Sequence, residues 1–184
     1  MADVLEKGQR ILLLVPEIGL TPQLLQRLEA RFNNRVLALH SGLTEHQRLN
    51  AWQQANLGQA DIIIGTRSAL FTPIPKLGLI IIDEEHDQAY KQQEGFRYHG
   101  RDLAIKRAAD AHIPIVLGSA TPSLESLYNA KVKRYEALCL PDRANSAVQP
   151  QLHLVDLRKK QLVAGLSKEL VDAIARHLAD ANQV

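Results

Sequence analysis

Short apolar runs alternate along this chain with segments of helical character, and this alternation restricts the fold more than any other feature. Continuous apolar runs of this kind are typical of strands buried on both faces. Strands that alternate with helices indicate an α/β protein with a parallel sheet. The runs are ILLLV at 11–15, RVLAL at 35–39, DIIIG at 61–65, LGLIIID at 77–83, IPIVLG at 113–118 and LHLVD at 152–156.

Helix signals fall between these runs. Thr21 followed by Pro22 is typical of a helix start, and Thr44 with Gln47 forms a capping box whose helix Gly58 would end. We expect further helices at about 101–111, 122–131 and 167–181.

Composition excludes some classes of function and leaves others open. The 22 basic and 20 acidic residues give a net charge of +2, too even to argue for nucleic acid or an anionic membrane by itself. Cys139 is the single cysteine, which excludes an internal disulfide and suits a reducing compartment, and we interpret it as a small buried hydrophobe. No apolar run approaches the roughly 18 residues of a membrane span, so no membrane is expected as a partner.

Polar motifs follow four of the predicted strands. In open parallel sheets ligands bind beyond the carboxyl ends of the strands, so these motifs predict a functional edge. They are VPEIGLTPQ at 15–23, GTRSALF at 65–71, DEEH at 83–86 and GSATPS at 118–123.

The DEEH motif carries the strongest chemical signal. Asp83 has the position of a carboxylate that holds a nucleotide's magnesium through water, and Glu84 could polarise an attacking water. The alternative is a solvated turn after a core strand. We interpret Glu85 and Asp87 as solvated, and a histidine such as His86, taken alone, is more often structural than a ligand.

The remaining strand ends offer hydroxyl groups and one cation. Ser119 and Thr121 could bond to His86 or Glu84, although GSATPS could equally be a helix start with Thr121 as its cap and Pro122 in the first turn. Thr66 and Arg67 could hold a phosphate, as could Thr21 with the helix amides behind it.

The stretch YKQQEGFRYHGRD at 90–102 differs in kind, because it holds three of the chain's seven Tyr and Phe residues among Lys91, Arg97, His99 and Arg101. Aromatic rings beside cations suit base stacking and backbone contact in single-stranded nucleic acid. The alternative is that the rings only pack an ordinary loop onto the core.

In this order the motifs resemble those of the bacterial primosomal replication-restart DNA helicases of superfamily 2, and DEEHDQAYKQQEGFRYHGRDLA at 83–104 is the most specific segment. The resemblance implies a RecA-like parallel sheet with helices on both faces. It implies a cytoplasmic bacterial motor that uses ATP and Mg²⁺ to move 3′ to 5′ along single-stranded DNA and restart stalled forks. Its implied partners are branched forks, primosome proteins and single-strand-binding proteins.

The resemblance also implies roles for individual residues. Asp83 and Glu84 would serve the Mg-ATP site, with Glu84 as the catalytic base, and His86, Ser119 and Thr121 would couple the nucleotide to DNA. The residues implied to contact DNA are Thr21, Pro22, Gln23, Thr66, Arg67, Lys91, Phe96, Arg97, Tyr98 and His99.

The sequence departs from the family pattern at one decisive motif, because no G-x-x-x-x-G-K-[ST] phosphate loop occurs in it. We expect an incomplete first motor lobe at 1–140, a linker in the polar stretch 141–150, and a connection toward a second lobe at 151–184. Zinc is expected only in a cysteine-rich insertion outside these residues. Two alternatives stay open: a non-catalytic DNA- or protein-binding module, and a metal-dependent phosphohydrolase built on the DEEH cluster.

We predict that these 184 residues alone do not hydrolyse ATP. An arginine finger contributes roughly 10³ to 10⁵ in rate and a general base roughly 10² to 10⁴, so Glu84 cannot offset the lack of both a finger and a phosphate loop. Phosphate release with magnesium and single-stranded DNA should match the buffer blank. Robust release would mean that the chain holds a nucleotide site that these motifs do not describe.

Overall fold

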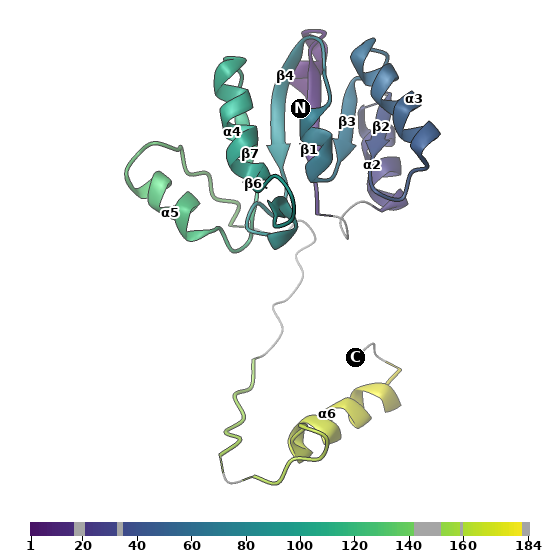
Figure 1. Ribbon diagram of the computed structural model, residues 1–184. Coiled ribbons are helices and arrows are strands. Elements are labelled where there is room, and N and C mark those ends of the chain that lie inside the picture. Colours follow the sequence, from purple (N-terminus) through teal and green to yellow (C-terminus); the bar gives the residue numbers. More distant parts are fainter. Residues whose placement is uncertain (17–20, 33–34, 142–151, 159, 182–184) are drawn as a thin grey trace. The chain divides into compact units, whose positions relative to one another are not determined.

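The structure is a computed structural model that describes residues 1–16, 21–32, 35–141, 152–158 and 160–181 (Figure 1). It divides into two compact units, Met1–Ala137 and Leu138–Val184. The first unit holds every motif described above.

A five-stranded parallel sheet forms the centre of the first unit, as predicted. Its strands lie in the order β2-β3-β1-β4-β7, so that β1 is central and β2 and β7 form the edges. The strands are β1 (Arg10–Leu14), β2 (Val36–Leu39), β3 (Ile62–Gly65), β4 (Leu77–Ile82) and β7 (Ile115–Leu117).

Helices cover both faces of this sheet (Figure 1). On one face Leu12 and Leu14 pack with alanines of α3 (Glu45–Asn56) and α4 (Gly100–Asp110). On the other face Leu13 packs with Leu28 of α2 (Pro22–Phe32). Each fully buried leucine or isoleucine stabilises the fold by roughly 1.5–3 kcal/mol, which is why strands buried on both faces read as continuous apolar runs.

The edge strand β7 departs from the prediction of strands buried on both faces. Val116 is 45% exposed. The strand has one neighbour, β4, and the helix that follows it, α5 (Leu124–Lys131), has no buried residue. Ile115 and Leu117 pack on the core cluster that includes alanines of α4, so only the opposite side of β7, which carries Val116, keeps apolar surface in solvent.

Local signals set the helix ends. The predicted capping box is present: Thr44 Oγ1 accepts from Gln47 N at 3.2 Å, and Gln47 Oε1 accepts from Thr44 N at 2.9 Å. Gly58, with φ of +69°, follows the end of α3. The prediction for α5 is wrong by two residues, because Ser123 caps the helix instead of Thr121, with its hydroxyl accepting from Ser126 N at 3.3 Å.

The strand predicted at 152–156 is wrong, and the structure has no strand there. Leu152 and Leu154 are almost fully exposed. A strand needs a neighbour for its main-chain groups, and among the described residues of the second unit the β-bridge pairs Val163 with Leu166. Apart from Pro141, the predicted linker lies outside the described residues.

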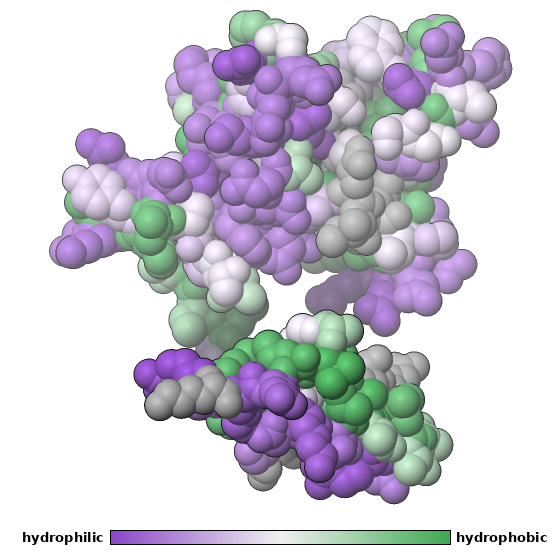
Figure 2. Space-filling model, turned by 60° about the horizontal axis from the view of Figure 1, so that its bottom comes forward, coloured by the Kyte–Doolittle hydropathy of each residue, from purple (hydrophilic) through white to green (hydrophobic). Residues whose placement is uncertain are grey.

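The second unit contains α6 (Lys168–Ala179), which Ser167 caps. The unit carries hydrophobic side chains along one side and hydrophilic ones along the other (Figure 2).

Cys139 is exposed, so its interpretation as a buried hydrophobe is wrong. Among the described residues, none of the helices has the length and apolar character needed to cross a bilayer. The short α1 (Ala2–Glu6) precedes the sheet in the first unit.

Candidate functional site

The polar motifs meet at one edge of the sheet, because main-chain bonds continue from the strands into the motifs. Val15 N donates to Gly65 O at 3.0 Å, and Asp83 N donates to Leu14 O at 2.9 Å. Gly118 O accepts from Glu85 N at 3.0 Å. The DEEH turn is thereby held between the ends of β1 and β7.

Glu84 occupies a backbone conformation that is uncommon for a residue with a side chain, with φ of +47°. This left-handed region costs roughly 1–2 kcal/mol for a non-glycine residue, and such strain gathers at functional sites. Asp83 Oδ1 accepts from Glu84 N at 3.1 Å, and the buried Tyr90 hydroxyl donates to Asp83 O at 2.7 Å. Burial, reinforced by the nearby carboxylates, raises the pKa of Tyr90, so this hydroxyl keeps the proton that it donates.

His86 lies between the two hydroxyls that the sequence singles out. Its Nδ1 is 2.7 Å from Ser119 Oγ, and its Nε2 is 3.2 Å from Thr121 Oγ1. Glu84 Oε2 lies 3.5 Å from His86 Nδ1. The structure therefore brings together Glu84, His86, Ser119 and Thr121 from two strand ends.

Glu85 is not solvated, and that prediction is wrong. Its side chain is 1% exposed, with Oε2 accepting from Arg101 Nη1 at 3.0 Å and Oε1 accepting from Ser123 N at 2.7 Å. Asp87 is also engaged, since its carboxylate accepts from Ala89 N at 2.7 Å and caps the short helix η3 (Gln88–Tyr90). The contact of Asp87 with Ala89 could have been predicted, because the two residues are two positions apart. No local pattern indicates the contact of Glu85 with Arg101, which lies sixteen residues away.

Thr66 and Arg67 follow β3 and open the short helix η2 (Arg67–Phe71), with Thr66 buried. Arg67 Nη1 donates to the carbonyls of Ala89 at 3.1 Å and Lys91 at 2.9 Å. Its guanidinium also lies 5.9 Å from the centre of the Tyr98 ring. Arg67 thus fixes η2 against the segment that carries the aromatic residues.

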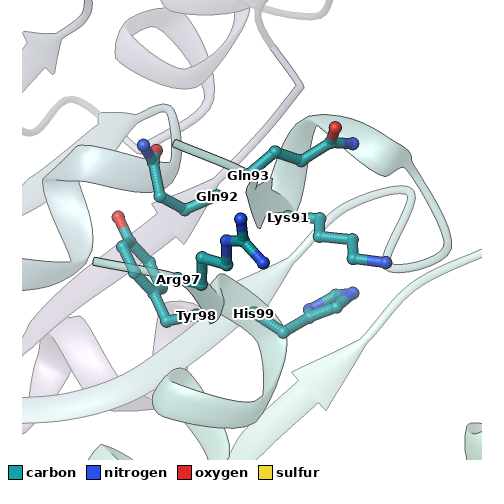
Figure 3. A pocket seen from close by; sticks show the side chains of 6 residues that line it. All are labelled: Lys91, Gln92, Gln93, Arg97, Tyr98 and His99. Carbon is teal, nitrogen blue, oxygen red and sulfur yellow. The ribbon is translucent and has the colours of Figure 1, made fainter. Parts of the chain in front are cut away.

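That segment is a short hairpin, β5 (Lys91–Gln92) paired antiparallel with β6 (Tyr98–His99). An open pocket of about 540 Å³ lies on it, and Lys91 and His99 project to one side while Tyr98 projects to the other (Figure 3). The other residues that line it are Gln92, Gln93 and Arg97.

The aromatic residues of the hairpin have different surroundings. Tyr98 meets Phe71 edge-on with ring centres 5.3 Å apart, so this ring packs the hairpin onto η2. Phe96 lies 6.2 Å from Tyr98 and is 80% exposed. Exposure of a large ring on a basic hairpin leaves its face open to a ligand.

His99 contributes no charge to this surface near neutral pH. Burial, together with the nearby Arg101 guanidinium, lowers the pKa of His99. Its Nδ1 is buried and has no hydrogen-bond partner among the described residues. The cations of the hairpin are therefore Lys91 and Arg97.

The start of α2 carries the other predicted contacts, Thr21, Pro22 and Gln23, all exposed. The Thr21 hydroxyl accepts from Leu24 N at 3.2 Å and caps the helix. Residues 17–20 of the same motif lie outside the described residues.

Asp83 fits a magnesium ion held through water. One of its oxygens accepts from Glu84 N, nothing among the described residues is seen to donate to the other, and the residue is exposed. Within the described ranges no group of three or more His, Cys, Asp or Glu could hold a metal ion directly. The phosphohydrolase alternative would need Glu85 as a ligand, but both of its oxygens are occupied by Arg101 and Ser123.

The model of the DEAD/DEAH box helicase family matches residues 1–130. The chain belongs to the DEAD/DEAH box helicase family. This membership fits the parallel sheet and the motifs at its edge.

Relatives named Replication restart protein PriA match nearly the whole chain. The protein from Haemophilus influenzae is 50% identical over 182 residues, 99% of this chain and 25% of that protein. The proteins from Bacillus subtilis and Synechocystis sp. are 43% and 51% identical over 98% and 85% of this chain, and 23% and 19% of their own lengths. The chain spans about a quarter of the curated relatives it matches, and the predicted resemblance to replication-restart helicases is confirmed.

Among solved structures, the chain resembles the C-terminal domain of the DEAD-box protein Dbp5 with a TM-score of 0.49 and 15% identity, over 73% of this chain and 79% of that one.

The Glu85 contacts predict a pH-dependent contribution to stability. Burial would raise the pKa of Glu85, but hydrogen bonds from Ser123 and Arg101 outweigh it and the pKa is lowered from 4.5. A carboxyl group whose pKa is lower in the folded state stabilises the fold when the pH is above its pKa in the unfolded chain. This stabilisation is lost as the pH falls through its pKa in the folded state. Glu85→Gln should reduce the free energy of unfolding by about 1–3 kcal/mol at pH 7 and progressively less below about pH 4.5.

Urea unfolding of the chain from pH 7 to pH 3 measures this effect. Glu45→Gln on the exposed surface of α3 is the control and should change the free energy of unfolding by less than about 0.5 kcal/mol. An equal loss for Glu85→Gln at every pH would show that the Glu85 carboxylate does not titrate differently in the folded and unfolded chain.

Proposed function

We propose that these residues are part of an ATP-dependent DNA helicase that restarts stalled replication forks in the bacterial cytoplasm. The whole protein would couple ATP hydrolysis to 3′ to 5′ movement along single-stranded DNA. Its partners would be branched forks, primosome proteins and single-strand-binding proteins. The family and the names of the relatives support this proposal.

The observation that carries the proposal is the bridge made by His86. Its ring contacts Ser119 and Thr121 on one strand end and lies beside Glu84 on another. Movement of either strand end changes the surroundings of Glu84. A motor needs such a connection, because hydrolysis and movement must depend on each other.

Asp83 and Glu84 would act on the nucleotide. The exposed Asp83 carboxylate would hold Mg²⁺ through water, and the ion would offset charge on the phosphates. Glu84, whose side chain is 46% exposed and within 3.5 Å of His86, would orient and deprotonate the attacking water. The strained backbone at Glu84 would hold its carboxylate away from the buried side chain of Glu85.

Single-stranded DNA would bind along the same edge of the sheet. Phe96 would stack on a base, while Lys91 and Arg97 would contact phosphates. Thr21, Pro22, Gln23, Thr66 and Arg67 would contact the backbone, and Tyr98 and His99 would support the hairpin. Without a phosphate loop, the 184 residues by themselves would bind DNA rather than hydrolyse ATP.

Glu84→Gln tests the catalytic role in the full-length protein. Because the general base is lost and the shape is kept, DNA-stimulated turnover should fall by roughly 10² or more while ATP binding stays within about twofold. Single-turnover hydrolysis and nucleotide binding are the measurements, and Glu45→Gln on α3 should behave as wild type. Near-normal turnover of Glu84→Gln would remove Glu84 from the mechanism.

Phe96→Ala and Arg67→Ala separate signalling from binding. If the hairpin reports DNA to the ATP site, Phe96→Ala should abolish DNA stimulation and leave basal hydrolysis and most DNA affinity intact. If Phe96 mainly stacks, affinity should fall about 5- to 150-fold. Arg67→Ala should weaken binding to DNA of every sequence. The slope of log affinity against log salt concentration should also fall by about one, as expected for the loss of one phosphate contact.

The measurements are ATPase rate and DNA affinity across a salt series. Trp52→Ala, which removes a partly exposed ring of α3, is the matched control and should change neither. Wild-type stimulation and affinity in Phe96→Ala would mean that the hairpin is only structural.

A further inference from the structure

A buried ion pair joins the DEEH turn to the end of the aromatic hairpin. Glu85 is 1% exposed and the Arg101 side chain 8% exposed, with Arg101 Nη1 3.0 Å from Glu85 Oε2. Ser123 completes the group, since its hydroxyl accepts from Arg101 Nη1 at 2.6 Å and lies 3.0 Å from Glu85 Oε2. These contacts form a buried triad of Glu85, Arg101 and Ser123.

The triad connects three segments that carry proposed functional residues. Glu85 lies between Glu84 and His86 in the DEEH turn. Arg101 lies in the first turn of α4, two residues after His99, where β6 ends. Ser123 caps α5 two residues after Thr121, the hydroxyl partner of His86.

The junction between hairpin and helix is tightly packed. A side-chain carbon at Gly100 would lie 3.2 Å from Arg67 Cγ and 3.3 Å from Tyr90 O. Those distances are closer than ordinary van der Waals contact, so the start of α4 lies against Arg67 and Tyr90 with room only for a glycine. Because β6 ends at His99 and α4 begins at Gly100, a displacement of the hairpin would reach Arg101 through the main chain.

Stability alone does not account for the triad. Removing two charges from water costs several kcal/mol each, and replacing a buried ion pair by apolar residues of similar volume is often neutral or stabilising. The best-attested use of such a pair is to fix one arrangement of the segments that it joins. Here those segments are the proposed DNA sensor and the proposed ATP site.

We propose that Arg101 is a positioning residue that passes the effect of single-stranded DNA at the β5–β6 hairpin to Glu84 and His86 through Glu85. This rests on the proposed function. DNA on the hairpin shifts β6 and the first turn of α4, and the Arg101 fork moves the Glu85 carboxylate. Because Glu85 separates Glu84 from His86 in the chain, both side chains change position together.

The test uses the full-length protein with two substitutions at the triad. Arg101→Met removes the charge, and the double variant Glu85→Leu/Arg101→Met replaces the pair by apolar groups that should keep the fold. Both should lower DNA stimulation of ATPase activity by about 5- to 150-fold, the range of typical coupling between sites, with basal hydrolysis and DNA affinity within about twofold. Thermal unfolding reports whether each variant is folded.

A second readout is independent of catalysis. Coupling between two ligands is reciprocal, so a non-hydrolysable ATP analogue should change the DNA affinity of the wild-type protein and have no effect on that of the double variant. Arg107→Met is the matched control, because Arg107 is an arginine of the same helix that donates to Thr72 O at 2.8 Å and does not contact the triad. It should keep DNA stimulation and the analogue effect.

The outcomes separate this inference from the function on which it rests. A wild-type protein without DNA-stimulated hydrolysis overturns both. Stimulation and analogue effect in the folded double variant equal to those of wild type overturn the role of Arg101 and leave the proposed function standing. Loss of both in Arg107→Met as well would mean that either arginine of α4 has the same effect, and the specific role of Arg101 would be wrong.

Discussion

The main-chain ladder continues beyond the ends of the strands, and the site depends on this continuation. Gly118 N donates to Ile82 O at 2.8 Å and Gly118 O then accepts from Glu85 N, so one residue of GSATPS holds both the end of β4 and the turn after it. Thr66 N donates to Leu39 O at 3.2 Å in the same way after β3. Parallel strands place their carboxyl ends at one edge, and these bonds carry that alignment into the polar motifs.

Sequence patterns predicted the sheet because apolar periodicity is a local property. Five of the six runs form strands, and the capping box at Thr44 forms because its two partners are three residues apart. The run at 152–156 fails because a strand also needs a neighbour, which no local pattern supplies. Thr121 and Ser123 could each cap α5, and the choice depends on Glu85, which accepts from Ser123 N.

Two adjacent carboxylates show why site chemistry is harder to predict than the fold. Glu84 and Glu85 have the same side chain and follow the same strand, yet one is half-exposed and the other is buried. The left-handed backbone at Glu84 turns the chain so that Glu85 reaches Gly118 and Arg101. Environment then separates their chemistry: the exposed group can reach water, while the buried group can only hold its neighbours.

The hairpin combines weak internal structure with strong attachment at its ends. Two residues in each strand give too little pairing for independent stability, so contacts with the lobe must hold it. Arg67 holds the entry to β5, Phe71 packs on Tyr98, and Arg101 holds the exit from β6. Phe96 and Arg97 at its exposed end have no comparable attachment among the described contacts. A segment fixed at its ends and open at its tip can respond to a ligand there and pass any displacement to the sheet only through those attachments.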